Sequence, residues 1–308
     1  MAVGRSSDIT NMTKAGINFV FNEALKAPQV IEYDQICTKY MEEKPIGTYL
    51  SAGDVGNAVD LDEGNVIVYE GIAEAYKTEI TTGTKAKGVK ATRKQMLDDQ
   101  TNTVKNLFGA KLVRAMIETK EQHVADKYND AFATTGADGV YIIHDAHPLV
   151  NSAAVNDNLI TGDISTDTLK TGITQFAFIK NQAGKRFPTK ATHILVHPSE
   201  QFNVIEIMNS QLMAQELTNT TNSIAKVAPI GMIFNNYLDT KARGNTYTPW
   251  FLLDKTMSDA GCILQYRGGM KLDTEEDFDT KDWKGTCIEE YTAAFVSPGY
   301  GIVGSLGT

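Results

Sequence analysis

The chain has 308 residues, of which 42% are hydrophobic and 22% are charged, as in a folded protein with a buried core. A formal net charge of −9 argues against a protein that grips nucleic acid through its overall charge, because such proteins normally present a basic face. The three cysteines, Cys37, Cys262 and Cys287, are too widely spaced for a disulfide framework or a zinc motif, so we expect a reducing compartment. We recognise neither a signal peptide nor a membrane span, and therefore expect no membrane partner.

Residues 1–44 are interpreted as an N-terminal arm. The segment begins polar, a moderate helix is predicted over 14–25, and Pro28 separates that helix from 30–41. This region has the length and character of an arm that packs on a neighbouring chain.

Residues 45–91 are predicted to form an extended loop with a β-hairpin. Only 66–69 and 75–82 carry β-favouring residues, and glycines punctuate the rest. Because an isolated hairpin with so little apolar surface is only marginally stable in water, we expect this hairpin to pack against a neighbouring copy of the same chain. The alternative is a long surface loop of an ordinary domain, which is uncommon at this length.

The stretch from 93 to 133 has apolar residues at helical spacing and predicts one long amphipathic helix. A helix of roughly 30 to 35 residues is about 50 Å long and organises the elements around it. The alternative is an ordinary core helix that breaks near Thr119. Residues 92–165 are therefore assigned to a domain built on this helix, followed by a turn-rich stretch at 134–158.

Residues 166–260 are predicted to form a second, mixed α/β unit. Helices are expected over 167–181 and 200–212, and strands over 192–196 and 250–253. Residues 261–308 read as strands that return to pack against the long helix, with an acidic run between 273 and 282.

One compact basic cluster stands out at Lys85, Lys87, Lys90, Arg93 and Lys94. We interpret it as a solvated or subunit-contacting edge, with a phosphate site as the alternative. The residues predicted to contact a neighbouring subunit are Val66, Val68, Tyr69, Ile80, Lys85, Lys87, Lys90 and Arg93.

No set of residues in the sequence predicts an enzyme. His144, Asp145 and His147 lie close together and are metal-ligand types, but a third ligand at fixed spacing is missing. Residues 60–71 superficially resemble a calcium loop, yet the glycine falls one position early and Gly71 replaces the required acid. No nucleophile elbow or P-loop is present. We therefore predict no catalytic residue, cofactor or bound metal.

Four segments in order resemble the major capsid proteins of tailed bacteriophages, in the branch of the Mu-like major head subunit. They are 87–99, where a basic residue precedes an acidic pair; 138–150; 222–254, with Pro229-Ile230-Gly231; and 277–282. The resemblance implies the α+β Hong Kong 97-like capsid fold. Its parts would be the arm, the extended loop, a peripheral domain of the long spine helix and the return strands, and an axial domain at 166–260.

The same resemblance implies a major capsid protein that assembles into pentamers and hexamers of an icosahedral shell around phage double-stranded DNA. Its expected partners are other copies of itself, DNA bound without sequence specificity, portal and scaffold proteins, and a decoration protein. The expected location is the virion capsid, after assembly in the cytoplasm of a bacterial host. The alternatives are an encapsulin-like nanocompartment shell and a soluble metal-dependent enzyme that uses His144, Asp145 and His147.

Overall fold

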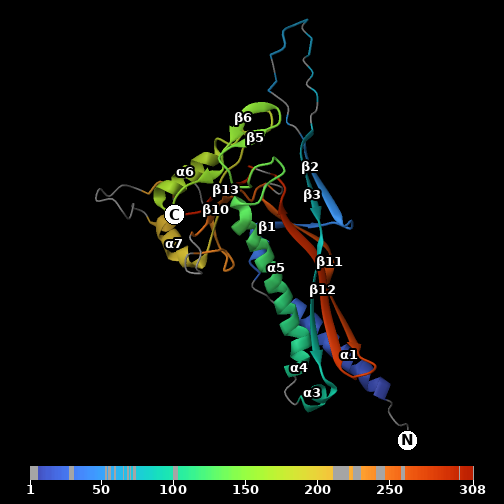
Figure 1. Cartoon of the computed structure of the whole chain (residues 1–308). Helices are drawn as coiled ribbons and strands as arrows, with labels where there is room; N and C mark the ends of the chain where they lie inside the picture. The colour runs from blue at the N-terminus through green and yellow to red at the C-terminus, as the bar shows by residue number, and fades with distance from the viewer. Residues whose placement is uncertain are drawn as a thin grey trace.

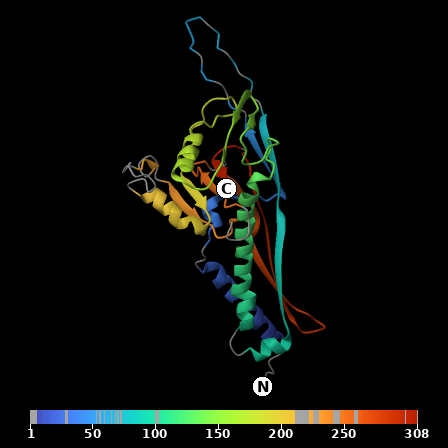
Figure 2. The same cartoon turned by 60° about the vertical axis from the view of Figure 1, so that its left-hand side comes forward.

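The computed structural model is an elongated molecule (Figures 1 and 2). It describes residues 6–27, 31–52, 54, 57–58, 60–64, 66–67, 69, 71, 74–99, 103–210, 222–224, 230–240, 247–257, 261–297 and 299–307. The α-helices are α1 (Ser6–Lys26), α2 (Tyr33–Ile36), α3 (Arg93–Asp98), α4 (Thr103–Asn106), α5 (Leu112–Asn129), α6 (Thr166–Phe176) and α7 (Gln201–Asn209). No helix among these described residues is long and apolar enough to cross a membrane.

The predicted long helix is present, but it starts later than expected. A π-helical turn, Leu107–Lys111, joins α4 to α5, and the helical backbone then continues through Thr119 to Phe132, so the alternative break near Thr119 is wrong. Residues from 93 form the separate helix α3, which begins with a capping box between Thr92 and Gln95. Asp99 leaves the helical conformation, and its carboxylate accepts a hydrogen bond from Val104 N at 2.8 Å, which caps the next helix.

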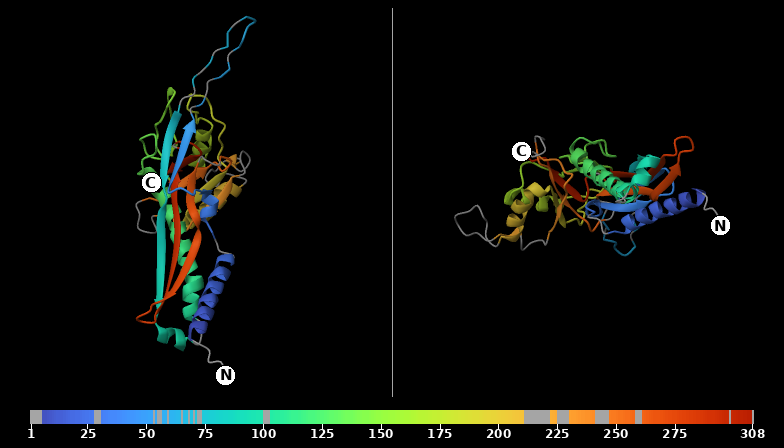
Figure 3. Two further views of the ribbon diagram at one scale, coloured as in Figure 1. Left: turned by 90° about the vertical axis from the view of Figure 1, so that its right-hand side faces the viewer. Right: turned by 90° about the horizontal axis from the view of Figure 1, so that it is seen from below.

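A four-stranded sheet lies against α5 in the order β1-β11-β12-β4 (Figure 3). Its strands are β1 (Cys37–Met41), β4 (Gly83–Ala91), β11 (Cys262–Glu276) and β12 (Trp283–Phe295). Alternate residues of β12 are buried, and Tyr291 and Ala293 share a core with Val124 and Tyr128 of α5. The prediction that the late strands return to the long helix is confirmed.

The second half of the predicted arm packs within its own chain. Tyr33 and Ile36 of α2 are buried in the core beside α5, and β1 pairs in parallel with β11. In α1, Ile17 and Phe21 are buried, the latter against Leu112. Residues 31–41 are therefore part of the body of the subunit.

A five-stranded sheet forms the second unit, in the order β7-β13-β10-β8-β9. Its strands are β7 (Leu159–Ile160), β8 (His193–Val196), β9 (Gly231–Phe234), β10 (Trp250–Leu253) and β13 (Ile302–Ser305). The prediction grouped all of 261–308 with the long helix, and this is wrong for β13, which pairs with β10 and β7. Every residue of β13 is buried, because the strand lies inside the sheet.

Two hairpins complete the fold. One pairs β2 (Ile46–Ala52) with β3 (Glu74–Thr81), and the described residues between them project from one end of the molecule (Figure 1). Of the predicted strand 66–69, the described residues 66, 67 and 69 are not in a strand. The other hairpin, β5 (His147–Leu149) with β6 (Ser152–Asn156), lies in the stretch interpreted as turns.

Replacing Leu112 by Asp should destabilise the subunit, because Leu112 is 2% exposed and a carboxylate there would be buried without a partner. We expect the free energy of unfolding in urea to fall by about 4 kcal/mol or more. Thr119→Asp, at an exposed position of α5, is the matched control. Equal unfolding curves for the two variants would contradict the assignment of this helix face to the core.

Candidate assembly surfaces

The β2–β3 hairpin and its loop carry apolar side chains outside any core of the chain. Val66 is 84% exposed, Tyr69 is 85% exposed, and Leu61 and Ile67 are each 57% exposed. A two-stranded ribbon has no second layer to cover such groups, so they lose water only when another surface covers them. The loop therefore has the chemistry of a contact surface for another molecule.

The body of the subunit holds the base of this hairpin through polar contacts. The Tyr76 hydroxyl donates to Pro148 O at 2.7 Å, and the Thr78 hydroxyl donates to Val296 O at 3.1 Å. Beyond the end of β2, Asp54 accepts a hydrogen bond from Gln182 N at 3.0 Å. These contacts come from three different parts of the chain, and they set the direction in which the loop projects.

The predicted contact residues fall into different environments. Val66 and Tyr69 are exposed on the loop, and Lys87, Lys90 and Arg93 are exposed at the other end of the molecule, whereas Lys85 is half-buried. Val68 lies outside the described residues. Ile80 is only 3% exposed, so its prediction as a contact for a neighbour is wrong: it faces the core of its own subunit, where Gln265 donates to its carbonyl.

A group of hydrogen bonds, which we call the clasp, joins the arm, the long helix and the second unit. The Glu121 carboxylate accepts from Glu32 N at 2.7 Å and Tyr33 N at 2.8 Å, and so caps the N-terminus of α2 from 88 residues away. Glu32 in turn accepts from Asn236 N at 2.9 Å, and Asn129 at the end of α5 accepts from Asp239 N at 2.9 Å. The clasp fixes the two units relative to one another.

Beside the clasp, Lys120 of α5 forms a buried ion pair with Glu289 of β12. Their side chains are 10% and 6% exposed, and the Lys120 ammonium lies 5.6 Å from the centre of the Tyr33 ring and 5.1 Å from that of Tyr291. Aromatic faces favour a nearby cation, which offsets part of the cost of removing it from water. The pair ties the long helix to the sheet at one place.

The histidine cluster does not form a metal site. His147 is buried, and its two ring nitrogens lie 2.6 Å from Asp138 Oδ2 and 3.1 Å from Asn158 Oδ1. His144 Nδ1 accepts from Ala146 N at 3.0 Å. Within the described part of the chain, no three His, Cys, Asp or Glu side chains are placed to hold a metal ion. Both ring nitrogens of His147 already contact side chains of the same chain, so neither faces a space that a metal could occupy.

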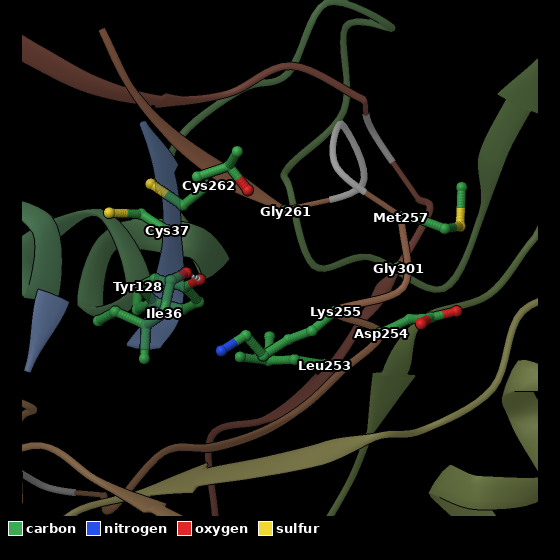
Figure 4. A pocket seen from close by; sticks show the side chains of 11 residues that line it. Ile36, Cys37, Tyr128, Leu253, Asp254, Lys255, Met257, Gly261, Cys262 and Gly301 are labelled. Carbon is green, nitrogen blue, oxygen red and sulfur yellow. Dashed lines mark hydrogen bonds between the residues drawn. The ribbon is translucent and has the colours of Figure 1, made fainter. Parts of the chain in front are cut away.

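Cys37 and Cys262 line a small cavity of about 50 Å³ beside β1, β10 and β11 (Figure 4). Cys37 and Cys262 are register partners on the parallel strands β1 and β11. Burial raises the pKa of the Cys37 thiol to about 12 and that of Cys262 well above its usual value, so both thiols stay protonated at neutral pH. A protonated thiol is a poor nucleophile, and a cavity this small does not admit a typical substrate.

The described structure therefore combines a projecting loop that exposes apolar side chains with a body that has its own buried cores, which is the layout of a self-assembling structural subunit. A model of the family described as phage capsid protein matches residues 75–303. No curated protein sequence matches the chain.

Solved structures share the fold. The cyanophage Pam1 capsid subunit is similar with a TM-score of 0.59 at 16% identity, over 88% of this chain and 87% of that chain. The procapsid subunit of bacteriophage JBD30 has a TM-score of 0.54 at 14% identity, over 98% of this chain and 76% of that chain. The subunit of the virus-like particle from Pyrococcus furiosus has a TM-score of 0.55 at 9% identity, over 94% of this chain and 98% of that chain.

The chain belongs to the phage capsid protein family, and its fold is the Hong Kong 97-like capsid fold. It is a major capsid protein, the type of subunit from which icosahedral phage shells are built, as the sequence predicted. Because the matching family is that of phage capsids, the encapsulin alternative is not favoured. The narrower relation to Mu-like head subunits stays a prediction.

The Lys120–Glu289 pair can be tested with a double-mutant cycle. Lys120→Met leaves the Glu289 charge buried without its partner, so we expect a loss of about 3–5 kcal/mol in the free energy of unfolding. Lys120→Met combined with Glu289→Leu removes both charges and should recover most of that loss. A double variant that is as unstable as the single one would contradict this account.

Glu121 should make the stability of the subunit depend on pH. Burial raises its pKa from 4.5 to about 7, although the two backbone N–H donors oppose the shift. Burial favours the neutral acid, so the stability that Glu121 contributes is complete below pH 4.5 and is lost as the pH rises through about 7. We expect the unfolding free energy of the wild type, relative to Glu121→Gln, to fall over this window. Parallel pH profiles for the two proteins would show that Glu121 does not titrate there.

Proposed function

We propose that copies of this chain form hexamers and pentamers of an icosahedral shell that encloses double-stranded phage DNA. The observation that carries the proposal is the exposed apolar loop between β2 and β3, with Val66 84% and Tyr69 85% exposed. Each loop would cover its apolar groups on a neighbouring subunit, so much of the stability would arise on assembly. Val66, Tyr69, Lys85, Lys87, Lys90 and Arg93 remain the proposed contact residues, and Val68 is proposed from the sequence alone.

The proposal assigns each segment of the chain to a part of the capsid fold. We assign 1–44 to an N-terminal arm, of which 31–41 pack within the body of the same chain, and 45–91 to the extended loop, whose last strand β4 joins the four-stranded sheet. We assign 92–165 and most of 261–308 to the peripheral domain, and 166–260 with β13 to the axial domain. The net charge of −9 suits a container that must release its DNA, because an acidic wall does not bind phosphates by bulk charge. The role is structural and not enzymatic.

The remaining partners are also proposals. A shell that fills with DNA needs a portal, and its curvature is commonly set by a scaffold, while a decoration protein would bind from outside. We propose that assembly takes place in the cytoplasm of the bacterial host. The proteins whose structures are similar include a procapsid and a capsid, which supports a shell as the assembled form.

Replacing residues 57–71 by a short Gly-Ser linker should abolish shells and leave a folded subunit. Only the loop is removed, because the replaced residues lie between β2 and β3, and the paired strands β2, β3 and β4 are left intact. We expect no closed particles by negative-stain electron microscopy, while the melting temperature stays near that of the wild type. The double variant Val66→Ser with Tyr69→Ser should also reduce the number of closed particles without lowering the melting temperature.

Val155→Ser is the matched control, since Val155 is 50% exposed on β6, outside this hairpin. Normal particles from the linker variant would refute the role of the loop. A failure of the wild type to form particles, with all proteins folded, would instead point to a missing scaffold, which co-expression with the rest of the head genes addresses.

A further inference from the structure

His147, the first residue of β5, has its imidazole ring buried between segments that are distant in the chain. Its side chain is 2% exposed. On one side the ring touches Gly299, where an added Cβ would lie only 2.9 Å from Cγ of His147. The ring therefore has a fixed position, and the groups that its two nitrogens contact decide which protons it carries.

Asn158 fixes the proton on one ring nitrogen. Its side-chain Nδ2 donates to Ile142 O at 2.9 Å, and its Oδ1 accepts from His144 N at 2.7 Å. These two bonds set the orientation of the amide, so the oxygen is the atom that faces the ring. Nε2 of His147 lies 3.1 Å from this oxygen, which can only accept. Nε2 therefore donates, and a neutral ring would carry its single proton there.

Asp138 requires a second proton on the same ring. Its Oδ2 lies 2.6 Å from Nδ1 of His147, and its side chain is 1% exposed. Without a proton between the two atoms, the lone pair of Nδ1 would face a carboxylate oxygen. Histidine is more basic than aspartate, so the proton belongs to the ring. In the part of the chain that the structure describes, Asp138 forms no other ion pair, and the imidazolium is its counter-charge.

The other titratable groups around the pair do not replace this charge. The ring centre of His144 lies 6.3 Å from that of His147, and Nδ1 of His144 accepts a backbone N–H at 3.0 Å beside the exposed Asp145. Tyr76 of β3 also lies near, because burial and then the charge of Asp138 raise the pKa of its phenol. A neutral imidazole, a carboxylate and a phenol offer no second cation to Asp138.

The strand that begins at His147 supports the base of the β2–β3 hairpin (Figure 1). Its second residue, Pro148, accepts a hydrogen bond at 2.7 Å from the Tyr76 hydroxyl of β3. The backbone N–H that follows β5 donates to Gln182 Oε1 at 2.9 Å, and Gln182 N donates to Asp54 beyond the end of β2. Both strands of the hairpin are therefore tied to the body through β5.

We propose that the buried His147–Asp138 pair is a proton-dependent lock on the base of the hairpin. While the pair holds its proton, the turn at Asp138, β5 and Asn158 stay joined. When the proton leaves, a buried carboxylate faces a ring lone pair, and β5 loosens together with the hairpin base that it supports. The inference goes beyond the proposed function, because it concerns the single subunit and is tested without assembly.

The sign of the pH dependence follows from the proton count. The folded pair retains a proton that a free histidine releases above about pH 6.5. The stability that the lock contributes is therefore complete just below about pH 6.5, and it is lost on the alkaline side as the folded protein also releases the proton.

Asp138→Asn tests the lock by changing which form of the ring fits. The amide can donate from its nitrogen to the lone pair of Nδ1, so the variant suits a neutral His147 that still donates to Asn158. We expect the curves of unfolding free energy against pH to cross, with the wild type more stable on the acidic side and the variant on the alkaline side. A purely structural role of Asp138 would only shift the curve.

Hydrogen exchange measures the hairpin base itself. At about pH 9, the β3 peptide that contains Tyr76 should exchange about tenfold faster in the wild type than in Asp138→Asn, which corresponds to one pH unit of linkage. Asp145→Asn is the matched control, because this carboxylate is 70% exposed and contacts His144. Its pH profile should run parallel to that of the wild type. Comparison at equal pH also cancels the titration of Glu121, which all three proteins share.

Nitrogen NMR of histidine-labelled wild type reads the protonation directly and needs no variant. With the ring assigned through bonds to the backbone of residue 147, we expect both ring nitrogens to carry protons at about pH 7, where a free histidine is mostly neutral. A lone pair on either nitrogen at that pH would overturn the proposal, as would parallel pH profiles for the wild type and Asp138→Asn. Crossing profiles with equal exchange at β3 would refute the role of the lock at the hairpin.

Discussion

The packing of α5 against β12 is the contact on which the rest of the subunit depends. One face of the helix contributes Val124 and Tyr128 to the core that contains the late strands, and Lys120 adds the ion pair with Glu289. The next residue, Glu121, caps α2 through the backbone N–H groups of Glu32 and Tyr33. At the end of the helix, Tyr128 also packs edge-on against Phe251 of β10. A single helix therefore positions the arm, both sheets and, through them, the surfaces that meet other subunits.

This rigid body contrasts with the β2–β3 loop. The body buries apolar side chains of both its units in shared cores, whereas the loop offers exposed apolar side chains on a ribbon that has no second layer. In the proposed shell, modest contacts would add up, because each subunit would both give and receive one. The closed particle would then be held by many contacts that are each weak alone.

Much of this architecture could be predicted from local sequence patterns. Helical periodicity predicted the long helix, and β10 was predicted at its observed bounds. The start of the helix was missed because Asp99 caps α4 through a side-chain contact that periodicity does not encode. The burial of Ile80 was missed because this strand lies beside residues that are distant in sequence, among them Gln265, which donates to the Ile80 carbonyl. The capping of α2 by Glu121 is likewise non-local.

The place of β13 has a consequence for biosynthesis. This strand is the last of the described strands to be synthesised, yet it lies inside the five-stranded sheet. It also links β7 to the rest of the sheet. Until it emerges, β7 and β10 have an open gap between them, and such non-local pairing forms late. A nascent chain therefore cannot complete this sheet before β13 has been made. A chain that lacks this strand has an incomplete second unit, which keeps half-made chains from being built into a growing particle.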